Sequence, residues 1–182
     1  MKDLSLNLLD IAENSVKAGA TLTQLLLTQE AGILTFQVVD DGCGMTEEVL
    51  RGVVDPFYTT RTTRKVGMGL PLLRMAADQT GGTMTVESRH KDVDPDNHGT
   101  VVTAVFHTDH IDCPPVGDLV ATVTTLIQGH PDTDFYFCHT DGGTEVELDT
   151  RQLREILGEV SLAEFEVLQW ITGYLTDQYN GQ

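Results

Sequence analysis

Positively charged residues are scarce in this sequence. Its 182 residues include 11 Lys and Arg against 28 Asp and Glu, which gives a formal net charge of −17 at pH 7. Proteins that bind nucleic acid or anionic membranes need clustered cations to neutralise phosphates. We therefore expect neither a nucleic-acid partner nor a membrane partner.

Long apolar runs and paired cysteines are also missing. No segment approaches the ~18–20 apolar residues of a membrane-spanning helix, and the N-terminus lacks the pattern of a secretory signal. The three cysteines, Cys43, Cys113 and Cys138, are odd in number and far apart, as expected in a reducing compartment. These absences predict a cytoplasmic protein.

Two common nucleotide-binding patterns are absent as well. The chain has no P-loop sequence, and neither of its Gly-x-Gly pairs stands in the strand-to-helix GxGxxG context of a Rossmann site. The 40% hydrophobic content supports a real core. The length suffices for one full domain and a small additional region.

Residues 38–45 are the most informative stretch. Asp40 ends an apolar run, and Gly42 and Gly44 follow with one residue between them. A strand that delivers a carboxylate into a cleft and then turns sharply has this form, since glycine permits positive φ. Asp-Gly is also a common turn dipeptide, so a plain turn is the alternative.

An upstream segment, residues 3–18, has helical spacing of its apolar positions and stops at Gly19. Asp10 and Asn14 are four residues apart and share one helix face, with Lys17 nearly in line. An amide oxygen can coordinate magnesium, and a lysine can offer its charge to a phosphate. A solvated polar face is the alternative.

A downstream segment combines hydroxyls, cations and a second Gly-x-Gly. Gly67 and Gly69 open an apolar helical run that starts at Leu70. Free N–H groups at a helix start, together with cations, favour an anion such as phosphate. Four of the eleven Lys and Arg fall between positions 61 and 74: Arg61, Arg64, Lys65 and Arg74.

Together these segments resemble the GHKL ATP-binding superfamily of gyrase-type topoisomerases, ninety-kilodalton heat-shock chaperones, sensor histidine kinases and MutL-type repair ATPases. The resemblance spans roughly residues 1–107. Residues 13–20 and 40–44 look MutL-like, whereas residues 56–70 and Gly81-Gly82 look like a histidine kinase with a short lid. Gly99-Thr100 resembles the last sequence box of the superfamily.

The resemblance implies where the base of ATP is bound. Asp40 would accept a hydrogen bond from the adenine amino group, with Thr100 and a water completing the contact. Gly42 and Gly44 would let the backbone approach the nucleotide. Met45 would pack against the adenine ring.

The resemblance also implies a phosphate and Mg²⁺ site. Asn14 would hold Mg²⁺ and Lys17 would contact phosphate. Gly67, Gly69 and the helix start at Leu70 would receive the β- and γ-phosphates. The lid cations that could reach the γ-phosphate are Arg61, Arg64 and Lys65.

Asp10 is the candidate catalytic residue. ATPases and serine kinases of the superfamily place a glutamate general base four residues before the Asn, where histidine kinases commonly place Asn. A carboxylate can activate a water or hydroxyl nucleophile. The alternative is that Asp10 only positions a magnesium-bound water.

The resemblance implies a two-layer α/β sandwich of the Bergerat type, a mixed, mostly antiparallel sheet with helices on one face. We place this domain at residues 1–110. The patterns predict helices at 3–18, 46–53 and 70–79 and strands at 21–28, 33–39, 83–89 and 100–107.

Residues 117–182 form a small α+β region without a recognisable catalytic motif. We read it as a packing or dimerisation appendage, or alternatively as a partner-docking module. We expect helices at 118–128, 150–157 and 161–179, strands at 134–139 and 144–148, and a hairpin turn at 141–143.

Two local details of this region can be predicted. Ser161 and Glu164 have the spacing of a capping box, and Thr150 is placed to cap the shorter helix. The apolar stripe expected on the last helix is Leu162, Phe165, Leu168, Trp170 and Ile171.

Two functions fit the resemblance. The first is phosphate transfer from Mg-ATP to a separate protein, because the sequence begins within the Asn-bearing helix and transfer is then expected in trans. The second is an ATP-dependent switch or weak ATPase that regulates a partner without phosphorylating it. Both imply a regulatory or substrate protein, and a homodimer is left open.

Overall fold

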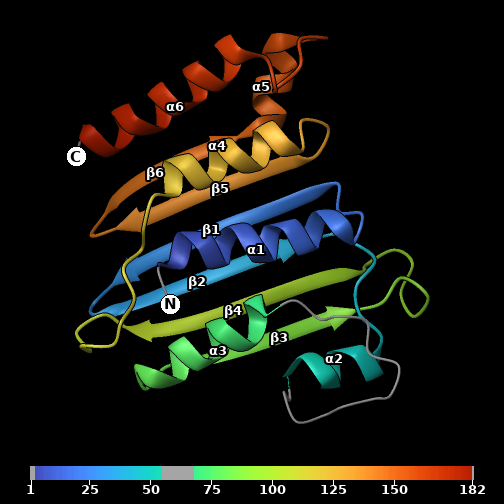
Figure 1. Ribbon diagram of the computed structural model, residues 1–182. Coiled ribbons are helices and arrows are strands. Elements are labelled where there is room, and N and C mark those ends of the chain that lie inside the picture. The colour runs from blue at the N-terminus through green and yellow to red at the C-terminus, as the bar shows by residue number, and fades with distance from the viewer. Residues whose placement is uncertain (1–2, 55–67, 182) are drawn as a thin grey trace.

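A six-stranded sheet with helices packed on it forms the frame of the protein, as seen in a computed structural model that describes residues 3–54 and 68–181 (Figure 1). The strand order is β3-β4-β2-β1-β5-β6. Only the β1–β5 pair is parallel, so the predicted mixed, mostly antiparallel sheet is confirmed. The strands are β1 (Leu22–Glu30), β2 (Ile33–Asp40), β3 (Thr83–Arg89), β4 (Gly99–His107), β5 (Asp134–Asp141) and β6 (Thr144–Asp149).

The described helices lie close to their predicted ranges. Helices α1, α3 and α4 run side by side across one face of the sheet, and α6 lies beside α4 near the β6 edge (Figure 1). Their bounds are α1 (Leu4–Lys17), α2 (Glu47–Val54), α3 (Gly69–Gln79), α4 (Leu119–Gly129), α5 (Thr150–Leu157) and α6 (Phe165–Asn180).

Helix α1 is capped at both ends. Asp3 is the N-cap and accepts a hydrogen bond from the Leu6 amide. The backbone N–H of Ala18 closes the last turn, and Gly19 follows with a φ of 77°. Between them Leu8 and Ile11 are buried against the sheet, each adding about 1.5–3 kcal/mol of hydrophobic stabilisation.

Alternation along the strands builds the core. In β2, Leu34, Phe36 and Val38 are almost fully buried, whereas the side chains between them are only partly so. The register between the strands determines which residues lie beside Asp40 at the end of β2. Asp40 lies opposite Thr100 of β4 and Thr23 of β1. A one-residue slip would turn Asp40 away from the helices.

The C-terminal region extends the same sheet. Helix α4 crosses over and delivers β5 parallel to β1, and β6 then pairs with β5 through the predicted hairpin turn at residues 141–143. The inward side chains Phe135, Phe137 and Val146 join one hydrophobic cluster with the core of the N-terminal part.

Two predicted caps in this region are wrong. Asp149, not Thr150, caps α5; the buried Thr150 hydroxyl accepts from the Phe135 amide at 2.9 Å and donates to Asp134. Helix α6 begins only at Phe165, and Glu164 makes no side-chain cap bond. The Ser161 hydroxyl instead accepts from the Ala163 amide at 3.1 Å, within a turn.

Three of the five residues in the apolar stripe predicted for α6 are buried. Leu162, Leu168 and Ile171 are buried, but Phe165 is 70% and Trp170 51% exposed. The buried face of α6 consists of Val167, Leu168, Ile171 and Leu175.

Candidate functional site

A cavity of about 350 Å³ opens between α1, α2, the start of α3 and the ends of β2 and β4. Its lining mixes polar groups from α1 and the strand ends with apolar side chains from all these elements. The lining residues that had been predicted are Asn14, Lys17, Asp40, Gly44, Met45, Leu70 and Thr100. Segments far apart in sequence thus meet around one hollow.

Asp40 ends β2 at the wall of this cavity. The Ser15 hydroxyl of α1 donates to one carboxylate oxygen at 2.6 Å, and the Gly42 amide donates to the other at 2.9 Å. These bonds hold the side chain in one orientation, and the carboxylate keeps acceptor capacity because each oxygen has two lone pairs. Asp40 can therefore accept a further donor from a ligand.

Asp41, the neighbour of Asp40, has a structural role instead. It accepts from the Thr21 amide at 2.7 Å, the Leu22 amide at 2.9 Å and the Thr21 hydroxyl. Burial alone would raise the pKa of Asp41, but these hydrogen bonds outweigh it and lower the pKa. Asp41 thus ties the end of β2 to the start of β1.

Glycine is required at two positions of the loop after β2. A Cβ on Gly42 would lie 2.9 Å from the Ala18 Cβ and 3.0 Å from an Asp40 oxygen. Gly44 has a φ of 69°, and a Cβ there would lie 2.0 Å from the Arg89 carbonyl oxygen. The loop is therefore held close to α1 on one side and to the end of β3 on the other.

A hydroxyl pair supports the opposite wall. Thr100, which is 8% exposed, has its hydroxyl 2.8 Å from that of Ser88. The Ser88 oxygen also accepts from the Met45 amide at 2.8 Å. Ser88 therefore joins β3, β4 and the loop that carries Met45.

The three polar residues predicted to share one face of α1 lie in two different surroundings. Asn14 and Lys17 are exposed and line the cavity. Asp10 is exposed but is not among the lining residues. It faces the first turn of α3, where a Cβ on Gly69 would lie 3.4 Å from the Asp10 Cβ.

Four predicted residues lie outside the described part of the chain: Arg61, Arg64, Lys65 and Gly67. Gly69 begins α3, with its buried backbone at the helix N-terminus. The described residues therefore supply the base-side wall and the helix start of the predicted site.

Sequence reasoning missed several lining residues. Ser15 lines the cavity and bonds Asp40, and Ser88, which lies behind the lining, supports Thr100. A single serine in a helix or strand gives no sign of either role. The apolar part of the lining comes from Ile11, Val49, Val53 and Val102, which read only as core positions. Cys43, which the sequence had placed beside the nucleotide, also lines the cavity.

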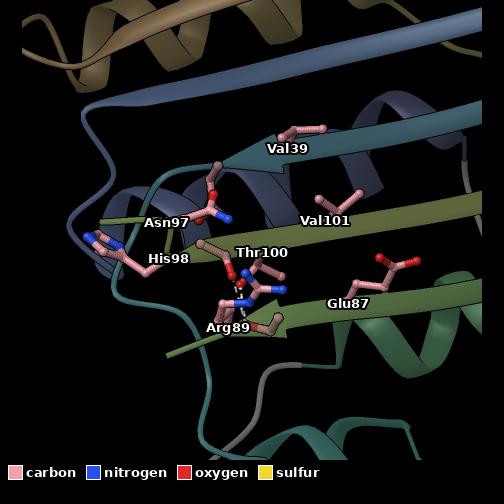
Figure 2. Close-up of a pocket in the computed structure, with 10 residues that line it drawn as sticks. Val39, Glu87, Arg89, Asn97, His98, Thr100 and Val101 are labelled. Atoms are coloured by element: carbon pink, nitrogen blue, oxygen red, sulfur yellow. Dashed lines mark hydrogen bonds between the residues drawn. The ribbon is translucent and has the colours of Figure 1, made fainter. Parts of the chain in front are cut away.

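A second, shallower pocket of about 270 Å³ lies across the strand ends. Figure 2 shows Val39 and Val101 on neighbouring strands, with Glu87 and Arg89 beside them on β3. The Arg89 guanidinium is already paired with Asp94 at 2.9 Å. Because that charge is largely satisfied, we assign this pocket no ligand.

Comparison with known proteins agrees with this geometry. Residues 2–110 match the family described as "Histidine kinase-, DNA gyrase B-, and HSP90-like ATPase". The chain belongs to this family. The match contains every element that lines the cavity, and domains of the family bind ATP or ADP.

Curated relatives include sensor kinases. The chain is 30% identical over 88 residues to the sensor histidine kinase ZraS of Klebsiella oxytoca, covering 48% of this chain and 19% of that protein. It is 26% identical over 87 residues to the sensor protein KdpD of Clostridium acetobutylicum, covering 45% and 10%. The chain thus spans a fifth or less of these relatives.

The fold also matches a solved structure over most of the chain. The Aquifex aeolicus MutL ATPase domain, complexed with ADP, aligns with a TM-score of 0.53 at 14% identity, covering 86% of this chain and 69% of that one. The predicted GHKL fold is therefore confirmed. No helix in residues 3–54 or 68–181 is long and apolar enough to cross a bilayer.

Proposed function

We propose that this protein binds Mg-ATP in the 350 Å³ cavity and transfers the γ-phosphate in trans to a partner protein. The observation that carries the proposal is the oriented Asp40 carboxylate at the cavity wall, held by Ser15 and Gly42. An acceptor fixed in this way can select adenine by its exocyclic amino group.

The walls around Asp40 fit a flat base. Apolar side chains of Ile11, Met45 and Val102 line the cavity together with the Thr100 hydroxyl. A purine ring gains from contact with such apolar surface, while a few placed polar groups fix its orientation. In this proposal Met45 packs against the ring and Thr100 completes the polar contact.

The α1 side fits a triphosphate and its metal ion. Asn14 and Lys17 are exposed at the cavity, and an amide oxygen and an ammonium suit Mg²⁺ and phosphate respectively. The buried start of α3 at Gly69 supplies N–H groups and the positive helix end. Mg²⁺, when bound, neutralises phosphate charge.

Asp10 is the proposed general base. It is exposed and faces the start of α3, where the phosphates are proposed to lie. A carboxylate in this place can orient an incoming hydroxyl and accept its proton. Because the Asp10 side chain is exposed to solvent, a partner's hydroxyl or a water can reach it.

A second function, an ATP-dependent switch or weak ATPase, is favoured by one contact. The Glu13 carboxylate of α1 lies 2.8 Å from the His130 ring nitrogen at the end of α4. Glu13 precedes Asn14, so a shift of α1 on nucleotide binding would be passed to the C-terminal region. The switch would act through that region on a partner.

Incubation with ATP labelled in its γ-phosphate, with and without a lysate, tests the proposal. Transfer requires that label appear on a second protein and that Asp10→Asn reduce it by about 100-fold or more, since 100-fold is the lower end of the range for general base catalysis. Free labelled phosphate alone would identify an ATPase and reject transfer. Binding without any release of phosphate would favour the switch.

A further inference from the structure

Two aromatic rings lie stacked on the outside of α6. The ring centroids of Trp170 and Tyr174 are 4.8 Å apart with an interplanar angle of 12°. The two residues are 51% and 41% exposed. A large apolar pair in water on a regular helix loses hydrophobic stabilisation that an inward position would provide.

Helix periodicity explains why these rings point outward. Val167, Ile171 and Leu175 occupy the buried face, so Trp170 and Tyr174 fall at its border and beyond it. The neighbouring positions on the exposed face are acidic or lack a side chain. We call this set the α6 stripe: Glu166, Trp170, Gly173, Tyr174 and Asp177.

The charge around the stripe has one sign. Residues 158–181 contain four carboxylate side chains and no Lys or Arg. Gly173 leaves open space beside the rings, because a Cβ there would meet no atom within 4 Å. The surface therefore offers a cation aromatic faces, carboxylates and open space at one place.

We propose that the α6 stripe is a docking surface for an arginine-rich basic segment of a partner protein. A guanidinium can stack on an aromatic face and also pair with a carboxylate. Glu166 lies one helical turn before Trp170, and Asp177 one turn after Gly173. The stripe can therefore offer both contacts to successive arginines.

Charge and edge geometry disfavour other occupants. A second copy would bring the same acidic stripe, within a chain of net charge −17, against this one. Strand addition at β6 is hindered, because the Gln178 side chain accepts from the Glu147 amide and donates to the Glu147 carbonyl, both at 3.0 Å. The proposal does not depend on ATP binding at the other end of the sheet.

Trp170 is the only tryptophan in the chain, so its fluorescence reports on the stripe directly. We expect a synthetic peptide of alternating arginine and glycine to change this fluorescence saturably, and a lysine–glycine peptide to bind more weakly. Tyr174→Ala should weaken arginine-peptide binding about three- to tenfold, as loss of a cation–π contact implies. Binding should also weaken with added salt.

Matched variants distinguish binding at the α6 stripe from general attraction between an acidic protein and a basic peptide. Glu166→Gln removes one charge within the stripe, and Glu155→Gln removes one exposed charge on α5. Only Glu166→Gln should lower affinity. Equal losses in both variants, an unresponsive Trp170, or a concentration-dependent dimer that Trp170→Ala abolishes would each overturn the proposal.

Discussion

Two Asp-Gly turns in this protein look alike in sequence and differ in their surroundings. Asp41-Gly42-Cys43-Gly44 follows β2 and is pressed between α1 and the end of β3, where added Cβ atoms would collide with other groups. Asp141-Gly142-Gly143 joins β5 to β6, and a Cβ on Gly142 or Gly143 would meet nothing within 4 Å. Close packing marks the first turn as part of a site, and open space marks the second as a connection.

The same difference extends to the two halves of the sheet. On the β2–β4 side, polar side chains meet around a cavity. On the β5–β6 side, Asp149 caps α5 and the Gln178 side chain bonds the backbone of β6. The exposed aromatic side chains of this half face outward on α6. One half surrounds a cavity, whereas the other presents an exposed helix face.

Alanine substitution at the two turns gives the largest expected contrast. Gly44→Ala should lower the free energy of unfolding by about 3 kcal/mol or more, because positive φ is combined with a backbone collision. Gly142→Ala should cost only about 1 kcal/mol, since its φ of 58° is strained but its surroundings are open. Urea denaturation measures both, and equal losses would contradict the contrast.

The adjacent aspartates give the next contrast. Asp40→Asn should weaken ATP binding roughly ten- to a hundredfold, as expected on losing a charge-assisted hydrogen bond of about 1.5–3 kcal/mol. Asp41→Asn should instead lower stability and leave affinity nearly unchanged, because its contacts are with Thr21 and Leu22. Calorimetric titration with ATP separates them; intact affinity in Asp40→Asn would refute the assignment.

A pH effect in the C-terminal half is expected to be the smallest. Burial lowers the pKa of His139 below its usual 6.5, despite the opposing charge of Asp141, and its ring accepts or donates one hydrogen bond with the Tyr179 hydroxyl at 2.8 Å. The unfolded chain then binds the proton more readily, so this stability is complete above about pH 6.5 and is lost as pH falls through the folded pKa.

Denaturation curves between pH 7.5 and 5 check this expectation, with His139→Gln as the test variant and the exposed His110→Gln as its control. His139→Gln should flatten the decline in stability toward acid, and His110→Gln should not. The same decline in both variants would mean that His139 does not carry the effect.

Much of the N-terminal fold could be read from the sequence. Apolar periodicity placed α1, β2 and β3 to within a residue or two, and the Gly-x-Gly after Asp40 marked the loop correctly because few other residues tolerate its geometry. Chain order of the motifs pointed to the family, which the match over residues 2–110 supports.

Other features of the fold and of the site could not be predicted from local sequence patterns. The capping box at Ser161 and Glu164 has the right spacing, yet the chain turns there and α6 begins later. Ser15 and Ser88 carry no signal of their own, because their role depends on Asp40, Thr100 and Met45 being brought alongside them by strand register.

The sequence by itself determined most of the elements, the family and several of the residues that line the cavity, because periodicity, glycine tolerance and side-chain chemistry are local properties. Only the tertiary structure decided that β5 and β6 join the same sheet, that Asp41 is structural beside Asp40, and that Trp170 faces outward. These outcomes depend on which surfaces pack together, and packing is settled between segments that are distant in the chain.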